Sequence, residues 1–255
     1  MNTPLSRTIL LLDIERYSDR DDVEQGILRR MLYDVADRTL DAAHVDEAQR
    51  SRADRGDSVM ELIAPDVPVS TLLRAVLTEL PDQLRNTNRL ASSSAQIRLR
   101  VVLAGGYVAV DPLGGWVGSD LNHACRLLDA DELRAALGDR TDDFALCVSD
   151  SIYQGVVRHG HLGIRPEDFH SITPDSKNGP LSAWLHGPVP PGQRGTKDKR
   201  KEKEREGAKP APNRSDRPVP PSAVHIAGDQ YGMAGGTVEG DASFTFGPRS
   251  GADRG

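Results

Sequence analysis

Residues 10–18 read LLLDIERYS, an apolar run that stops abruptly at the carboxylate of Asp13. The stretch from Arg7 to Ile14 is apolar and too short for a helix, so it predicts a buried β-strand. An aspartate at the end of such a strand is either a cap for the following turn or a ligand in a functional site. The rest of the sequence bears on that choice.

The segments that follow alternate between helix and strand patterns. Apolar residues at helical spacing predict an amphipathic helix from about Val23 to Ala43, with Asp19, Asp21 and Asp22 as candidate N-caps. The further expected elements are a hairpin at 50–54 and 57–63 that turns near Gly56 and Asp57, a helix at 69–84, a strand at 96–103 with a continuation at 107–110, a helix from Ser119 or Asp120 to Leu128, a strand at 144–148, a short helix at 149–157 and a strand at 181–186. This order predicts an α+β, ferredoxin-like fold, a mostly antiparallel sheet with helices packed on one face.

The composition divides the chain into two parts. Residues 187–255 hold 9 of the 17 prolines and 12 of the 24 glycines, and they carry 12 Lys and Arg against 9 Asp and Glu. The first 186 residues carry 20 against 29 and are therefore acidic, with a net charge of −9. We expect one acidic globular domain at 1–186, long enough to bury a core, followed by a basic tail.

The same sequence excludes several classes of protein. No apolar run approaches the roughly 18–20 residues that span a bilayer, and no secretory signal precedes the first strand. The two cysteines, Cys125 and Cys147, indicate free thiols in a reducing compartment rather than a disulfide framework. An acidic domain argues against a nucleic-acid partner. The sequence therefore predicts a cytoplasmic protein without a membrane span.

Four polar residues are candidates for chemistry: Asp13, Asp57, Asn122 and Arg126. In a ferredoxin-like sheet the first strand and the hairpin are neighbours, so the two carboxylates converge, and such a pair suits Mg²⁺. Asn122 and Arg126 lie four residues apart on one helix face, where an amide and a guanidinium suit a sugar and a phosphate. Taken singly, each residue also has an ordinary interpretation, as a strand cap, a Gly-Asp turn or part of a solvated helix face.

Taken in order, these segments resemble the class III adenylate and guanylate cyclases. The likeness rests on residues 10–18, on RGDSVM at 55–60, on the strand from Ile97 to Tyr107 and on WVGSDLNHACRL at 116–127, and it covers roughly residues 7–160. These segments are similar to the family's first metal strand, its Gly-Asp hairpin, its central strand and the start of its Asn/Arg helix.

The resemblance implies a role for each candidate. Asp13 and Asp57 would hold two Mg²⁺ or Mn²⁺ ions, the backbone around Ile14, Tyr17 and Ser18 would wrap the triphosphate of an NTP, Asn122 would orient the ribose, and Arg126 would stabilise charge on the reacting phosphate. The ribose 3′-hydroxyl would attack the α-phosphate and expel pyrophosphate, leaving a 3′,5′-cyclic nucleotide. In this family one subunit supplies the aspartates and the other supplies the Asn/Arg helix, so a homodimer with two sites is implied.

Two positions depart from the family pattern. The family reads adenine with a Lys four residues before the hairpin Asp and an Asp seven residues before the helix Asn, and these positions are Ala53 and Gly115 here. Neither residue reads a base edge, and Arg52, Asp54 and Asp120 are the nearby candidates to replace them. The base stays open, purine or pyrimidine, and so does an alternative function as a catalytically inactive, cyclase-like adaptor.

The tail has three expected parts. Residues 187–222 include ten consecutive charged residues at 197–206 and five prolines within 210–221, which indicates a disordered linker. Residues 223–247 alternate β-prone pieces with glycine and resemble bacterial amyloid signalling sequences, which implies a protein partner with the same motif. Chance β-propensity in a disordered tail is the other interpretation, and residues 248–255 are expected to be disordered.

Overall fold

The computed structural model describes residues 3–111, 114–176 and 179–188. The chain divides into two units, Met1–Gly207 and Ala208–Gly255, and the second unit lies wholly outside the described residues. The predicted linker at 187–222, apart from its first two residues, and the predicted segments at 223–247 and 248–255 lie outside them as well.

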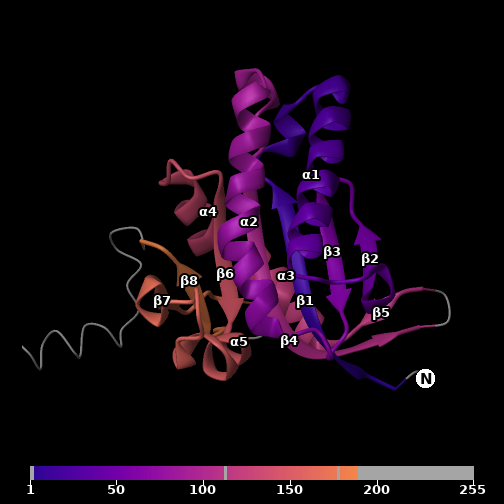
Figure 1. Cartoon of the computed structure of the whole chain (residues 1–255), viewed down its shortest axis with the longest axis vertical. Helices are drawn as coiled ribbons and strands as arrows, with labels where there is room; N and C mark the ends of the chain where they lie inside the picture. Colours follow the sequence, from indigo (N-terminus) through magenta and orange to yellow (C-terminus); the bar gives the residue numbers. More distant parts are fainter. Residues whose placement is uncertain (1–2, 112–113, 177–178, 189–255) are drawn as a thin grey trace, which may run out of the picture. The chain divides into compact units, whose positions relative to one another are not determined.

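A mixed β-sheet organises the described residues (Figure 1). Its strands follow the order β2-β3-β1-β4-β6-β8-β7, and the short β5 pairs with β4. Neighbouring strands are antiparallel except β4 and β6, which are parallel. The strands are β1 Leu5–Ile14, β2 Arg50–Asp54, β3 Ser58–Ile63, β4 Leu99–Val110, β5 Trp116–Val117, β6 Phe144–Ser149, β7 Phe169–Ile172 and β8 Ala183–His186. The α+β class and the mostly antiparallel sheet are confirmed.

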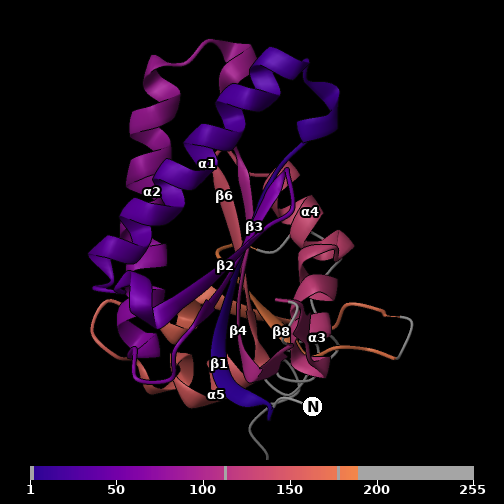
Figure 2. The same cartoon turned by 90° about the vertical axis from the view of Figure 1, so that its right-hand side faces the viewer.

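Helices cover both faces of this sheet, as Figure 2 shows for the pairs α1–α2 and α3–α4. One face carries α1 Asp22–Ala42, α2 Val69–Leu90 and α5 Asp150–Gly155, and the other carries α3 Ser119–Leu128 and α4 Asp131–Gly138. The expectation of helices on one face is therefore wrong. The sequence patterns also did not predict α4, β5 or β7.

The sequence of strand β1 explains why both faces of the sheet are covered by helices. Leu10 and Leu12 are buried against α1 and α2, whereas Ile9 and Leu11 are buried on the side of α3 and α4. Successive side chains of a strand point to opposite faces, so a continuous apolar run requires cover on both sides. The run that indicates a buried strand therefore also indicates a two-sided sheet.

The N-terminus of α1 is fixed by a capping box. The Asp21 carboxylate accepts hydrogen bonds from the N–H groups of Val23 and Glu24, and Glu24 reaches back to the N–H of Asp21. Of the three candidate caps, Asp21 is the one used. The helix then buries its apolar stripe against α2 and the sheet.

Two glycines position α3 against β4. A side chain at Gly106 would overlap the side chain of Asp120, and a Cβ at Gly118 would lie 2.6 Å from the carbonyl oxygen of Tyr107. The segments expected at 96–103 and 107–110 consequently form one strand, β4, on which the start of α3 lies directly. Within the described ranges, no helix has the length and apolarity that a membrane span requires.

Candidate active site

Asp13 and Asp57 converge at the ends of β1 and β3. The two strands are antiparallel with Asp13 opposite Ser58, and the Ile14 N–H donates to the Asp57 carbonyl over 3.0 Å. Both aspartates line one cleft of about 390 Å³, whose other wall includes Asp129 at the end of α3. In the structure the two aspartates therefore lie together, as the sequence predicts.

Arg100 also lines this cleft, and the sequence patterns did not single it out. It lies directly opposite Asp13 in the β1–β4 register. Its Nε donates to Asp13 Oδ2 over 2.9 Å, and its terminal NH2 group donates to the same oxygen. Both side chains are largely buried, with exposed fractions of 10% for Asp13 and 15% for Arg100. Asp13 therefore already has a cationic partner within the chain.

Despite this partner, the surroundings of Asp13 disfavour the charged form of its carboxyl group. The pKa of Asp13 is raised from 3.8 to about 6: burial is the largest cause, Arg100 lowers the pKa, and the neighbouring carboxylates of Asp57 and Asp129 raise it. A buried carboxylate beside two others is costly to ionise without an added cation. Such an arrangement is typical of a functional site rather than of a simple strand cap.

The difference in unfolding free energy between Asp13→Asn and wild type, both free of metal, is expected to depend on pH. Because the folded pKa lies above the unfolded value of 3.8, Asp13 stabilises the fold below about pH 3.8 and loses that contribution as the pH rises through about 6. The unfolding free energy of wild type should fall relative to Asp13→Asn by roughly 1 kcal/mol between about pH 5 and about pH 7.5. Denaturant titration of both proteins in chelator measures the gap. A gap that does not change with pH would contradict the burial argument.

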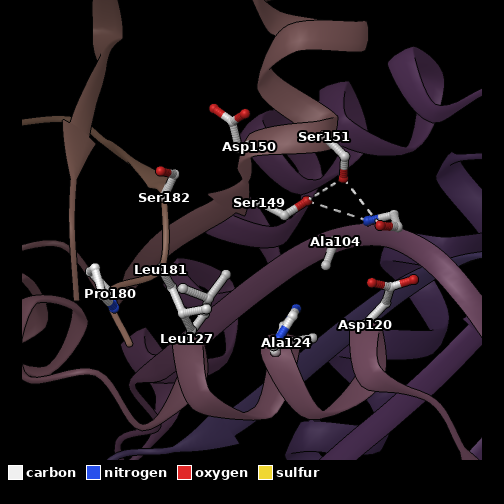
Figure 3. Close-up of a pocket in the computed structure, with 12 residues that line it drawn as sticks. Ala104, Asp120, Ala124, Leu127, Ser149, Asp150, Ser151, Pro180, Leu181 and Ser182 are labelled. Carbon is white, nitrogen blue, oxygen red and sulfur yellow. Dashed lines mark hydrogen bonds between the residues drawn. The ribbon is translucent and has the colours of Figure 1, made fainter. Parts of the chain in front are cut away.

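Helix α3 presents three different faces. Cys125, Leu128 and Asp129 line the cleft of the aspartates. Asp120, Ala124 and Leu127 face a second pocket, of about 320 Å³, beside the hydroxyl groups of Ser149 and Ser151 (Figure 3).

Asn122 and Arg126 lie on the remaining face, about 90° around the helix from the residues at the aspartate cleft. Asn122 is exposed, and Arg126 borders a different pocket together with Asp131 and Glu132. Within one chain the structure therefore does not bring Asn122 and Arg126 to Asp13 and Asp57.

Comparison with known proteins identifies the architecture. No family model matches the sequence, and no curated protein is significantly similar to it in sequence. Solved structures do match. The guanylyl cyclase Cya2 superposes with a TM-score of 0.52 at 15% identity over 76% of this chain and 99% of that chain. The described domain has a nucleotidyl cyclase fold.

Two further cyclases support this assignment of the cyclase fold. An adenylate/guanylate cyclase/hydrolase from Silicibacter pomeroyi matches with a TM-score of 0.50 at 20% identity, covering 72% of this chain and 98% of that chain. A bacterial light-regulated adenylyl cyclase matches with a TM-score of 0.52 at 15% identity, covering 76% of this chain and 53% of that chain. The predicted cyclase-like fold is confirmed, and the similarity concerns the fold alone.

The loop after β1 in this cyclase fold is sharply turned. Arg16 adopts a left-handed conformation with φ of 56°, which costs a non-glycine residue roughly 1 kcal/mol. Ile14 is buried in the core and its N–H bonds to the Asp57 carbonyl, so a contact between Ile14 and a triphosphate would require that bond to open. Tyr17 is half-buried and Ser18 is exposed at the start of a short 3₁₀ turn, where the first N–H groups have no acceptor within the turn.

The two base-reading positions are occupied by structural residues. Ala53 packs at the edge of the core. Gly115 accepts a hydrogen bond from the Asp111 N–H and donates its own N–H to Asp111 Oδ1, each over 2.8 Å. The three candidate replacements are already engaged: Arg52 with Glu61 and Asp37, Asp54 with Arg29, and Asp120 with the Tyr107 N–H. As folded, each of them therefore already has a hydrogen-bond or ion-pair partner, and Asp120 also lines the second pocket.

The donor set of the aspartate cleft fits Mg²⁺ or Mn²⁺. These ions need only one or two protein carboxylates because water and phosphate oxygens complete the shell. Asp13 and Asp57 supply those two, and the cleft leaves room for more ligands. Within the described residues, no group of three or more His, Cys, Asp or Glu residues is suited to a metal ion.

Proposed function

We propose that this protein is a nucleotidyl cyclase that converts an NTP to a 3′,5′-cyclic nucleotide and pyrophosphate in a signalling system. The observation that carries the proposal is the convergence of Asp13 and Asp57 in one cleft of a cyclase fold. The raised pKa of Asp13 supports it, because a buried carboxylate cluster is stabilised by an added cation. The two free cysteines are in keeping with a cytoplasmic protein.

The proposed reaction forms one bond and breaks one. The ribose O3′ bonds to the α-phosphorus, the bond from that phosphorus to the bridging oxygen of the β-phosphate breaks, and pyrophosphate leaves while the hydroxyl proton passes to water. Bound Mg²⁺ or Mn²⁺, two ions per site, would make the hydroxyl more acidic and neutralise phosphate charge. Asp13 and Asp57 would hold these ions.

The remaining residues would position the nucleotide. Tyr17, Ser18 and the Ile14 backbone would contact the triphosphate at the turn after β1. Asn122 would orient the ribose through its amide, and the Arg126 guanidinium would stabilise the charge that develops on the reacting phosphate. Such groups would act through hydrogen bonds to the bound nucleotide, and for Ile14 this contact would first require its bond to the Asp57 carbonyl to open.

The positions of residues on α3 support a homodimer. Cys125 and Leu128 line the helix side of the cleft of Asp13 and Asp57, whereas Asn122 is exposed and is not among the residues that line it. One site that uses all the proposed residues therefore needs α3 from a second copy. By two-fold symmetry the dimer would have two such sites.

Incubation of the full-length protein with ATP, GTP, CTP and UTP in turn, each with Mn²⁺, tests the proposal. We expect cyclic product and an equal amount of pyrophosphate from at least one nucleotide. Because Ala53 and Gly115 have no side-chain group that could read a base edge, the kcat/KM values of two or more nucleotides should agree within about tenfold. Chromatography of the products and a pyrophosphate assay measure this. The absence of product from all four nucleotides would contradict the proposal and favour the adaptor.

The adaptor is the second candidate function, and the occupied base-reading positions favour it. In that case the cyclase-like domain would bind without turnover and recruit an effector through the tail. For either function we propose that residues 187–222 are a linker and that residues 223–247 bind a protein partner carrying a similar motif. The charged run at 197–206 supports the linker, since such runs are strongly solvated.

A further inference from the structure

The ion pair between Arg100 and Asp13 engages Oδ2, one of the two oxygens of a carboxylate that would hold a metal ion. Nε and the terminal NH2 group of Arg100 both donate to Asp13 Oδ2, one of them over 2.9 Å. The pair is set by backbone register, because residues 13 and 100 are directly opposite on two central strands of the sheet. This contact is therefore part of the folded domain and not a chance surface pairing.

A bare divalent cation at Asp13 would meet this guanidinium at close range. Two positive charges a few ångströms apart in a part-buried cleft repel each other much more strongly than they would in water. Binding of such a cation therefore favours movement of Arg100 away from the carboxylate. The Arg100 side chain is only 15% exposed. If the guanidinium left Asp13 without a new anionic partner, it would be an unpaired and largely desolvated charge.

A polyphosphate offsets this cost because its oxygens provide a new anionic partner for the Arg100 guanidinium. We propose that Arg100 is an internal counter-ion of Asp13 that disfavours binding of a bare divalent cation at this carboxylate and permits binding of a cation that arrives with a polyphosphate. The inference rests on the proposed function for Asp13 as a metal ligand. It makes binding of the ion and of the polyphosphate cooperative, with Arg100 as the coupling residue.

Arg55 provides a matched control. It lines the same cleft and carries the same charge, but it is exposed, and the ion pair of Asp13 is made with Arg100. Arg55→Gln therefore removes one positive charge from the cleft and leaves the contact at Asp13 intact. A purely electrostatic effect of cleft charge would appear in both arginine variants.

The test is calorimetric titration of full-length protein with Mn²⁺ alone and with the Mn²⁺–tripolyphosphate complex, at about pH 8. Tripolyphosphate has no ribose and cannot be cyclised, so turnover plays no part. Wild type should bind the complex about tenfold more tightly than the bare ion. Arg100→Gln should bind bare Mn²⁺ about tenfold more tightly than wild type and lose the preference for the complex. Arg55→Gln should keep the wild-type preference.

Melting curves guard against a folding defect in Arg100→Gln, in which Asp13 has no partner. We expect a lower melting temperature without metal and a larger rise on addition of Mn²⁺ than in wild type. Arg100→Lys keeps the charge with a weaker contact and should bind bare Mn²⁺ with intermediate affinity. Bare-ion affinity in Arg100→Gln equal to that of wild type, or undetectable in both, would overturn the inference. The nucleotide panel decides the proposed reaction separately, because it measures product formation by wild type.

Discussion

Asp57→Asn is expected to lower cyclic nucleotide formation by at least about a thousandfold while the domain keeps its fold. Asparagine keeps the backbone carbonyl that accepts from the Ile14 N–H, so the junction of the hairpin with β1 is preserved. What it removes is one of the two carboxylates that would hold the ions. The loss should therefore appear in kcat, measured by pyrophosphate release with Mn²⁺ and the best nucleotide, and hardly in the melting temperature.

Asp66→Asn is the matched control for this prediction. Asp66 is an exposed turn aspartate at the other end of β3, where its carboxylate accepts from Gln49 over 2.7 Å. It is far along the strand from the cleft, and its loss should leave turnover within about twofold of wild type. Wild-type turnover by Asp57→Asn would remove this carboxylate from the mechanism and with it the two-carboxylate site.

The convergence of Asp13 and Asp57 could be predicted because it depends on local features. An apolar run that ends at Asp13 and a hairpin with Gly-Asp at its turn need only one pairing, β1 with β3, to bring the carboxylates together. The expected ferredoxin-like sheet supplied that pairing, because its first strand and the hairpin are neighbours. The physical signals involved, strand length and turn chemistry, both act within a few residues.

Arg100 and Asp129 could not be predicted in the same way. Arg100 meets Asp13 from 87 residues further along the chain, and the contact depends on the exact register of two central strands. A slip of one residue would send Arg100 to the opposite face of the sheet. Asp129 reaches the cleft only because Gly106 and Gly118 allow α3 to lie close to β4.

The expectation that helices cover only one face of the sheet was a different kind of error. The unbroken apolar run of β1 already contained the signal, since half of its side chains need cover on each face. The short helix α4 supplies part of that cover through Leu133, Ala136 and Leu137, whose spacing is helical. A sequence interpretation that counted apolar faces would have found both.

A mixture of two inactive variants should recover activity. Asp57→Asn removes a carboxylate from one half of the proposed site, and Asn122→Ala removes the ribose contact from the other half. Asn122 is exposed on α3, so its truncation leaves the core intact. If the site is shared between two copies, a heterodimer of these variants contains one site with both defects and one with neither.

Random exchange in an equal mixture makes about half of the dimers heterodimers, each with one intact site of two, so turnover should return to about a quarter of wild type. Denaturation and refolding together, or long co-incubation, allows the exchange, and pyrophosphate release measures the recovery. A mixture of Asp57→Asn with Asp13→Asn is the control: both defects lie in the same half, so every site stays incomplete and no activity should return. Recovery in the control, or its absence from the first mixture, would contradict a site that takes its carboxylates from one copy and its Asn122 and Arg126 from the other.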